Sequence, residues 1–221
     1  AEPVSRYYEA EHAGHGVRIA LRASVTALRG DAQGRVCAVA TAAGELEAQL
    51  VIVGIGVLAA DTLARNAGLV CDNGVQVDEY CRSSDPAIYA IGDCSNHPSL
   101  RYGRRVRLES VDNAFEQGST AAVNILGGAQ RHDRVPWFWS DQYHHKLIII
   151  GLAQGHDRMV LRGDPTQHAF SCCYLQGGEL LAIDTVNQAR DQMAARKLIA
   201  ARARLDPEKL ADASIPLKDC G

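Results

Sequence analysis

The stretch that most constrains this chain runs from Pro86 to Asn113 and reads PAIYAIGDCSNHPSLRYGRRVRLESVDN. Its apolar run at residues 88–91 predicts a strand buried on both faces, as in a parallel sheet. The strand is expected to end at Gly92 and Asp93. Ligands of open α/β sheets bind beyond the carboxyl ends of strands, where an aspartate can accept hydrogen bonds from sugar hydroxyls. We therefore expect a ligand site at this Gly-Asp pair.

A helix is predicted to follow, with Ser110 as its N-cap. Its apolar or small positions recur at helical spacing, at Val111, Phe115, Gly118, Ala122 and Ile125. Its N-terminus carries unpaired N–H groups and a partial positive charge. We expect that end to face a group that gains negative charge, and the small residues to let the helix pack close to a neighbour.

The composition narrows the class of protein. The chain has 221 residues, of which 47% are apolar and 22% charged, enough for one or two domains with a sizeable core. A net charge of −3 argues against a general nucleic-acid binder. No apolar run is long enough to span a membrane, and the opening AEPVSRYYEAEH lacks the regions of a signal peptide. We expect a cytoplasmic protein without nucleic-acid or membrane partners.

Seven cysteines with no C-x-x-C spacing predict reduced thiols. We interpret the Cys172-Cys173 pair as packing within an alternating strand, not as a redox pair. His144 and His145 are adjacent, so on a strand they point to opposite faces, and no third ligand is near in sequence. No metal site is predicted.

The first part of the chain has the pattern of the second half of a nucleotide-binding domain. A helix is predicted over residues 1–15, and strands over 17–21, 24–29, 36–41 and 45–49, the last leading into a buried strand at 50–53. Residues 54–59 then read G-x-G-x-x-A, the dinucleotide-binding fingerprint. We reject that fingerprint because the helix after it, at 61–67, is too short to return to a parallel strand.

The last part of the chain is predicted to be a small α+β domain that begins at Val135, after a polar linker at 127–134. Strands are expected near residues 147–152, 158–162, 169–176 and 179–185, with Gly177-Gly178 as a two-residue hairpin turn. A helix over 189–204 follows, capped by Asn187. Its predicted buried stripe comprises Ala194, Leu198, Ala201 and Leu205.

Three separated runs, in order, resemble a known family: NGVQVDEYCRSSDPAIYAIGDC, RLESVDNAFEQG and VPWFWSDQYHHKL. They are similar to the FAD- and NADH-dependent ferredoxin reductases of bacterial oxygenase systems, over nearly the whole chain. The resemblance implies hydride transfer from NADH to FAD, followed by single-electron transfers to a ferredoxin-type iron–sulfur protein that serves an oxygenase. The flavin supplies that chemistry, while the protein positions it.

The resemblance also implies roles for individual residues. Asp93, after Gly92, would bind the ribityl chain of FAD, and the backbone of Val111 would contact the isoalloxazine ring. Trp139 would lie beside the flavin, whereas Trp137 is expected to be a core residue. Gly56 and Glu109 would lie near the nicotinamide.

Members of that family carry two glycine-rich phosphate loops, and neither is found in this sequence. The chain therefore resembles the C-terminal part of a longer reductase. The expected fold is α/β: an incomplete flavoprotein with two dinucleotide-binding domains, plus a small α+β C-terminal reductase domain. The predicted parts are 1–56 from the NADH domain, 57–134 from the FAD domain, and 135–221. FAD and NAD(H) are then cofactors of the parent enzyme, whose remainder is a required partner, and this chain alone would bind FAD weakly or not at all.

Four arginines, Arg101, Arg104, Arg105 and Arg107, form a basic cluster next to the expected flavin contacts. Positive charge there would steer an acidic iron–sulfur protein toward the flavin. A solvated loop explains the cluster equally well. Two other functions remain open: part of a flavin disulfide reductase, whose redox cysteines would lie outside this sequence, and a non-catalytic docking or structural module.

Overall fold

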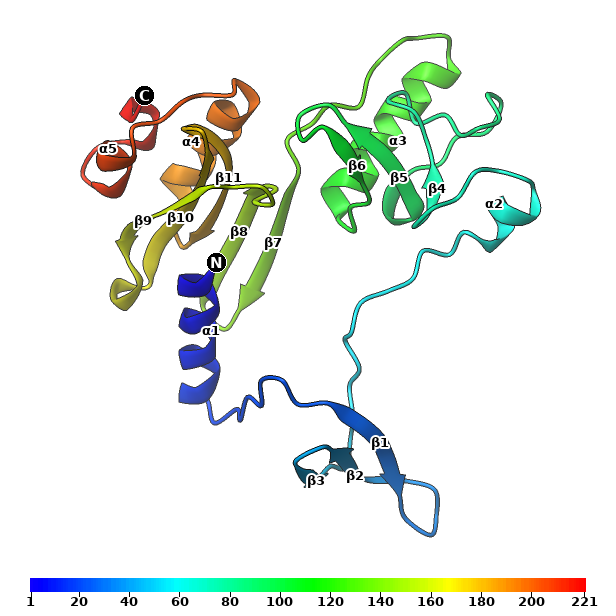
Figure 1. Cartoon of the computed structure of the whole chain (residues 1–221), viewed down its shortest axis with the longest axis vertical. Coiled ribbons are helices and arrows are strands. Elements are labelled where there is room, and N and C mark those ends of the chain that lie inside the picture. The colour runs from blue at the N-terminus through cyan, green and yellow to red at the C-terminus, as the bar shows by residue number, and fades with distance from the viewer. The chain divides into compact units, whose positions relative to one another are not determined.

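The computed structural model describes residues 1–221 and divides them into two compact units. One unit comprises residues 6–57, and the other comprises residues 1–5 together with 58–221 (Figure 1). The helix α1 spans Glu2–Gly14, as expected for the first 15 residues. None of the helices combines the length and hydrophobicity needed to cross a lipid bilayer.

The first unit contains a small antiparallel sheet in the order β1-β2-β3. Its strands are β1 (Val25–Gly30), β2 (Val36–Thr41) and β3 (Gly44–Glu47), close to the predicted positions. The strands predicted at 17–21 and 50–53 are wrong, because neither segment pairs with another strand. Leu50 and Ile52 remain 78% and 88% exposed, so this run is not a buried strand here.

The second unit begins with the short helix α2 (Thr62–Asn66), close to the brief helix expected at 61–67. A three-stranded sheet follows in the order β4-β5-β6, formed by β4 (Val75–Gln76), β5 (Ser95–Ser99) and β6 (Arg104–Val106). The long helix α3 spans Val111–Ile125.

The predicted strand at 88–91 is also wrong. Only Tyr89 makes an isolated bridge, to Arg82, and Ile88 and Ile91 are exposed. The backbone at Ile91 is extended, so the local conformation is that of a strand. A ladder also needs a neighbouring strand, and residues 88–91 pair with none.

The last part of the chain forms a five-stranded antiparallel sheet in the order β7-β8-β11-β10-β9. The strands are β7 (Trp137–Gln142), β8 (His145–Gly151), β9 (Arg158–Asp164), β10 (Ala169–Gln176) and β11 (Glu179–Val186). The turn between β10 and β11 is Gly177-Gly178, as predicted. Both glycines have positive φ, which the tight hairpin requires.

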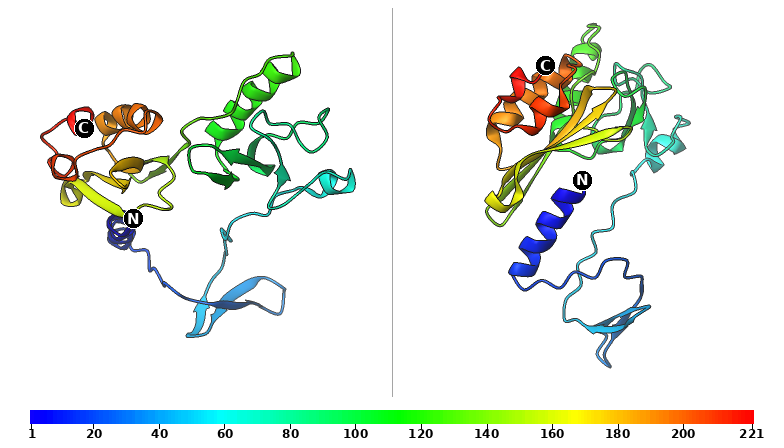
Figure 2. Two further views of the ribbon diagram at one scale, coloured as in Figure 1. Left: turned by 45° about the horizontal axis from the view of Figure 1, so that its top comes forward. Right: turned by 60° about the vertical axis from the view of Figure 1, so that its left-hand side comes forward.

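Helices α4 (Ala189–Ala200) and α5 (Pro207–Ala211) cover one face of this sheet (Figure 2). The core lies between sheet and helices and includes Ile150, Leu180, Ile183 and Ile199. Single-turn 3-10 helices occur at η1 (Gly92–Cys94), η2 (Pro165–Gln167) and η3 (Leu217–Asp219).

Three details of the α4 prediction need correction. Asn187 does not cap the helix: its side chain accepts from the Lys146 N–H and donates to the His168 carbonyl, while Gln188 occupies the N-cap position. The helix ends at Ala200 because Arg202 adopts a left-handed conformation. The buried positions are Asp191, Ala195 and Ile199, so the stripe lies one residue beyond the predicted Ala194 and Leu198, which are only partly buried.

Candidate functional site

The start of α3 is built as the sequence predicts. The Ser110 side chain accepts from the Asn113 N–H at 3.2 Å, which satisfies one of the orphan donors of the first turn. Val111 follows as the first helical residue and is 69% exposed. Its backbone therefore lies at an accessible, positively polarised helix end.

The apolar stripe of α3 is expected to be the buried face of the helix, but in the structure the opposite face is buried. Val111, Phe115 and Ile125 are exposed, whereas the buried positions are mostly polar. These buried residues are Asn113, Gln117, Thr120, Ala121 and Asn124. Polar side chains of α3 thus hold the neighbouring loops, and its apolar stripe is not covered by other parts of the chain.

The Gly-Asp pair lies in η1, against the first turns of α3. Gly92 has a φ of +71°, and a Cβ placed on it would lie 3.4 Å from the Ala114 Cβ. Asp93 is exposed, and its carboxylate has no protein partner. The structure therefore brings Asp93 and the N-terminal end of α3 into one region of the second unit.

Three of the four clustered arginines form hydrogen bonds or ion pairs with other residues of the protein. Arg101 donates to the Ile199 and Ala200 carbonyls at the end of α4. Arg105 bonds to Asn96 and to the Val77 carbonyl. Arg107 donates to the Asp93 carbonyl at 2.9 Å and pairs with Glu109 at 2.6 Å.

Arg104 differs from the other three arginines, because its exposed side chain makes no such bond within the protein. It is therefore the one member of the cluster whose charge is fully available to a partner.

The two tryptophans of β7 lie side by side, with ring centroids 5.2 Å apart. Trp137 is tied to α3: its indole N–H donates to Asp112, and Arg196 lies 4.8 Å above its ring. Burial raises the pKa of Asp112, while the Trp137 N–H and the Arg196 charge oppose that shift. Trp139 is partly buried and packs against the core of the last domain.

A cleft of about 160 Å³ lies between the start of α3 and the strands β7 and β8. Glu109 and Ser110 line one side, and Trp137, Phe138 and Ile149 line the other. Its walls are mainly apolar, with the exposed Glu109 at its edge. The cleft adjoins the helix end expected to face the flavin.

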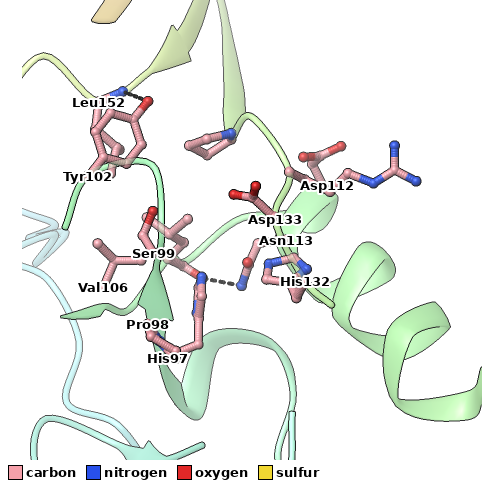
Figure 3. A pocket seen from close by; sticks show the side chains of 13 residues that line it. His97, Pro98, Ser99, Tyr102, Val106, Asp112, Asn113, His132, Asp133 and Leu152 are labelled. Carbon is pink, nitrogen blue, oxygen red and sulfur yellow. Dashed lines mark hydrogen bonds between the residues drawn. The ribbon is translucent and has the colours of Figure 1, made fainter. Parts of the chain in front are cut away.

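A smaller cavity of about 20 Å³ (Figure 3) shares the lining residues Leu108, Pro136 and Leu152 with this cleft. The Tyr102 hydroxyl accepts there from the Leu152 N–H at 2.9 Å, which links the loop before β6 to the end of β8. His97 and His132 meet edge to face at 4.9 Å. Burial lowers the pKa of His97 to about 4 and also lowers the pKa of His132, so both rings are neutral at pH 7.

Gly56 belongs to the first unit, where it is exposed and has a positive φ of 93°. The helix that follows residues 54–59 has only five residues, too few for the helix of a dinucleotide loop. Glu109 belongs to the second unit and is exposed.

Several residues of this region were not found from the sequence. Gln117, His97 and Asp112 make hydrogen bonds around η1 and α3, and Tyr102 links the loop before β6 to the end of β8. The sequence does contain one indication of this buried polar face. Polar residues recur at helical spacing, at positions 113, 117, 120 and 124.

Family models match two parts of the chain. Residues 1–118 match the pyridine nucleotide-disulphide oxidoreductase model, and residues 137–221 match the model described as reductase C-terminal. The chain belongs to the pyridine nucleotide-disulphide oxidoreductase family. The expected mixture of helices and sheet with a reductase C-terminal domain is thereby confirmed.

The resemblance to ferredoxin reductases is also confirmed. This family member is 44% identical over 218 residues to the ferredoxin reductase subunit of a 5,5'-dehydrodivanillate O-demethylase from Sphingobium. It is 42% identical over 221 residues to putidaredoxin reductase from Pseudomonas putida. These alignments cover 98% and 99% of the chain but 53% and 52% of the relatives, so the chain spans about half the length of the curated relatives it matches.

Solved structures of ferredoxin reductases also superpose closely on this chain. A ferredoxin reductase from Rhodopseudomonas palustris superposes with a TM-score of 0.95 at 38% identity, covering 99% of this chain and 54% of that one. A covalent complex of putidaredoxin reductase with putidaredoxin gives a TM-score of 0.95 at 42% identity, covering 99% of this chain and 53% of that one.

Proposed function

We propose that this chain is the C-terminal part of a reductase that passes electrons from NADH through FAD to a ferredoxin-type iron–sulfur protein serving an oxygenase. The observation that carries the proposal is 42% identity to putidaredoxin reductase over 221 residues, which includes both the Gly-Asp turn and the reductase C-terminal domain. The proposed domain boundaries are 1–56, 57–134 and 135–221. The compact-unit division after Val57 and the family match from residue 137 support them.

The residues around η1 suit FAD. Asp93 offers an unpaired, exposed carboxylate that can accept from ribityl hydroxyls. The Val111 N–H and the helix end offer a donor and partial positive charge to the flavin edge that gains electron density on reduction. When bound, FAD would supply the hydride acceptor and the single-electron donor.

The remaining site residues have matching proposed tasks. Trp139 is proposed to shield the flavin from water, and Gly56 and Glu109 to lie near the nicotinamide of NAD(H). Arg101, Arg104, Arg105 and Arg107 are proposed to face the iron–sulfur partner. Because three of them are bonded internally, Arg104 would contribute most to steering that partner.

We further propose a cytoplasmic location, where free thiols persist. All seven cysteines are unpaired, which supports it. FAD binding by this chain without the rest of the reductase is proposed to be weak or absent, because the chain spans about half of its relatives.

The test is electron transfer by the complete polypeptide that carries this sequence. Purified protein is supplied with FAD, NADH and a bacterial [2Fe–2S] ferredoxin, and reduction of cytochrome c by the ferredoxin is followed. We expect reduction that requires all three components, and Arg104→Glu should lower the rate at low ionic strength. Reduction of a disulfide substrate without any ferredoxin activity would instead support a disulfide reductase. Activity in neither assay would support a docking module.

A further inference from the structure

Gln117 is the most deeply buried polar side chain of α3, with no exposed surface. Its carbonyl oxygen accepts two hydrogen bonds, from the Gly92 N–H at 2.7 Å and from the Ser95 hydroxyl at 2.7 Å. Its amide nitrogen lies 3.0 Å from His97 Nδ1. One side chain thus joins η1 and β5 to the middle of α3.

The orientation of this amide is fixed by its surroundings. The Gly92 N–H can only donate, so the oxygen of Gln117 must face it. The amide N–H then points to His97 Nδ1, which accepts because the buried imidazole is neutral. All three hydrogen bonds are satisfied only in this arrangement.

The same turn is held from the other side. Arg107 donates to the Asp93 carbonyl, and Gly92 packs directly against Ala114. Gln117 and Arg107 therefore fix the backbone on both sides of the Asp93 side chain. The carboxylate itself remains free of protein partners.

We propose that Gln117 is a positioning residue for the flavin site: through the Gly92 N–H it sets the Asp93 carboxylate at a fixed place relative to the N-terminus of α3. This rests on the proposed function, because it assigns the positioned carboxylate to FAD. Gln117 does not touch the cofactor. Its contribution is to hold a turn that would otherwise have several conformations available to it.

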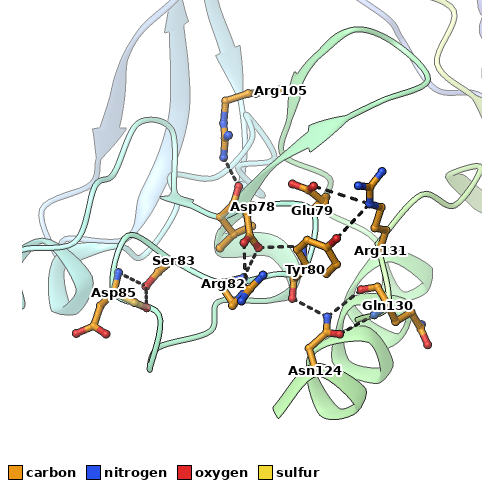
Figure 4. Close-up of polar contacts among 11 residues, drawn as sticks. Asp78, Glu79, Tyr80, Arg82, Ser83, Asp85, Arg105, Asn124, Gln130 and Arg131 are labelled. Carbon is orange, nitrogen blue, oxygen red and sulfur yellow. Dashed lines mark hydrogen bonds and ion pairs between the residues drawn. The ribbon is translucent and has the colours of Figure 1, made fainter. Parts of the chain in front are cut away.

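Asn124 provides a matched control. It lies on the same buried face of α3, and its amide nitrogen donates to the Tyr80 and Gln130 carbonyls at 3.0 and 2.8 Å (Figure 4). Its oxygen accepts from the Gln130 N–H at 2.7 Å. Asn124 therefore holds loops other than η1, so Asn124→Leu removes a comparable buried amide without touching the Asp93 turn.

The experiment compares Gln117→Met, Gln117→Glu and Asn124→Leu with the wild type in the complete polypeptide. Hydrogen exchange of the peptide that contains Gly92 reports on the turn, and flavin fluorescence gives the FAD dissociation constant. We expect Gln117→Met to speed exchange at Gly92 and to weaken FAD binding at least tenfold. Asn124→Leu should leave the FAD dissociation constant within twofold of the wild type.

Gln117→Glu keeps an oxygen for Gly92 and Ser95, so it should restore FAD binding to within about threefold of the wild type. Its carboxylate would also face His97, whose other ionisable neighbours are His132 and Arg105. An NMR titration of His97 should therefore show a higher pKa in Gln117→Glu than in Gln117→Met, because only the Glu variant adds a negative charge beside the ring.

Three results would overturn the proposal: unchanged exchange at Gly92 in Gln117→Met, faster exchange without weaker FAD binding, or loss of FAD binding in a folded Gln117→Glu protein. If Gln117→Met does not fold, FAD binding by the Gln117→Glu variant tests the proposal. Absence of FAD binding in the wild type would refute the proposed function instead, while the exchange measurement would still test the hold on Gly92.

Discussion

At the residue scale, the most consequential polar contact in the last domain is the buried pair of Arg162 and Asp191. Their side chains are 5% and 8% exposed, and the Arg162 Nε lies 3.0 Å from Asp191 Oδ2. The guanidinium also donates to four carbonyls between Leu210 and Ile215. Arg162 thereby ties the final segment of the chain to the sheet.

Asp191→Ala leaves this guanidinium buried without its counter-charge, so we expect a loss of about 3–5 kcal/mol in the free energy of unfolding. Urea denaturation measures it. The exposed pair of Arg29 and Glu45 is the control, and Glu45→Ala should cost no more than about 1 kcal/mol. Equal effects of the two substitutions would show that burial does not decide the strength of these pairs.

The thiols offer a second prediction at this scale. Cys172 and Cys173 have no exposed surface, and burial raises the pKa of the Cys172 thiol to about 11 and that of Cys173 still further. Because the thiolate is the reactive form, both should resist a thiol reagent at pH 8 in the folded protein, whereas exposed Cys37 reacts. Cys37→Ser should reduce the fast phase of labelling, to which the partly exposed Cys71 and Cys94 also contribute. Rapid labelling of Cys172 or Cys173 would refute the interpretation of this pair as packing.

His97 makes stability depend on pH. Its pKa is about 4 in the folded protein, below the value of 6.5 for an unperturbed histidine. Between these values the unfolded state binds more protons, so stability falls as the pH is lowered from 6.5 toward 4, by at most about 1.4 kcal/mol per pH unit from this group. The pKa of His132 is also lowered, so this residue changes stability with pH in the same direction.

Urea denaturation at pH 7 and pH 5 measures this dependence. His97→Asn keeps an acceptor for Gln117 but does not titrate, so its loss of stability between the two pH values should be smaller. A loss as large as in the wild type would assign the effect to other groups.

At the scale of elements, α3 depends on its N-cap. Ser110→Ala removes the acceptor for the Asn113 N–H, and we expect it to lower the free energy of unfolding by about 0.5–2 kcal/mol. Ser110→Asp keeps a capping oxygen and should stay near the wild type in the same denaturation experiment. If Ala and Asp behave alike, the hydrogen bond does not stabilise the helix.

The elements also show what the sequence could predict. The hairpin of β10 and β11 was predicted accurately because the mainly apolar run of each strand and the Gly177-Gly178 turn are local features. The strands at 50–53 and 88–91 were not formed, because a buried strand needs neighbours that local sequence does not specify.

For the candidate site, too, the sequence identified some residues and missed others. Ser110 was identified as the cap of α3 from its residue type and its position before the helix. Gln117 and Asp112 were missed, since their partners, Gly92 and Trp137, lie 25 residues away in sequence. Asn187 suits an N-cap by residue type, but its side chain binds two other hairpins instead.

At the scale of the whole molecule, the residues proposed to bind FAD lie in the second unit, whereas Gly56, proposed to lie near the nicotinamide, belongs to the first. The second unit holds the Asp93 turn, the start of α3 and the tryptophan pair, while α3 leaves its apolar stripe exposed. The chain spans about half of its relatives, which fits cofactor binding that depends on both halves of a longer polypeptide.

The most direct test is therefore an FAD titration, followed by flavin fluorescence, of this chain and of the complete polypeptide, each as wild type and Asp93→Ala. We expect little or no binding by the 221-residue chain and tight binding by the complete polypeptide. Asp93→Ala should weaken the latter at least about tenfold, because a hydrogen bond to a charged group contributes roughly 1.5–3 kcal/mol. Equal affinity of Asp93→Ala and wild type would contradict the assignment of this turn to the flavin.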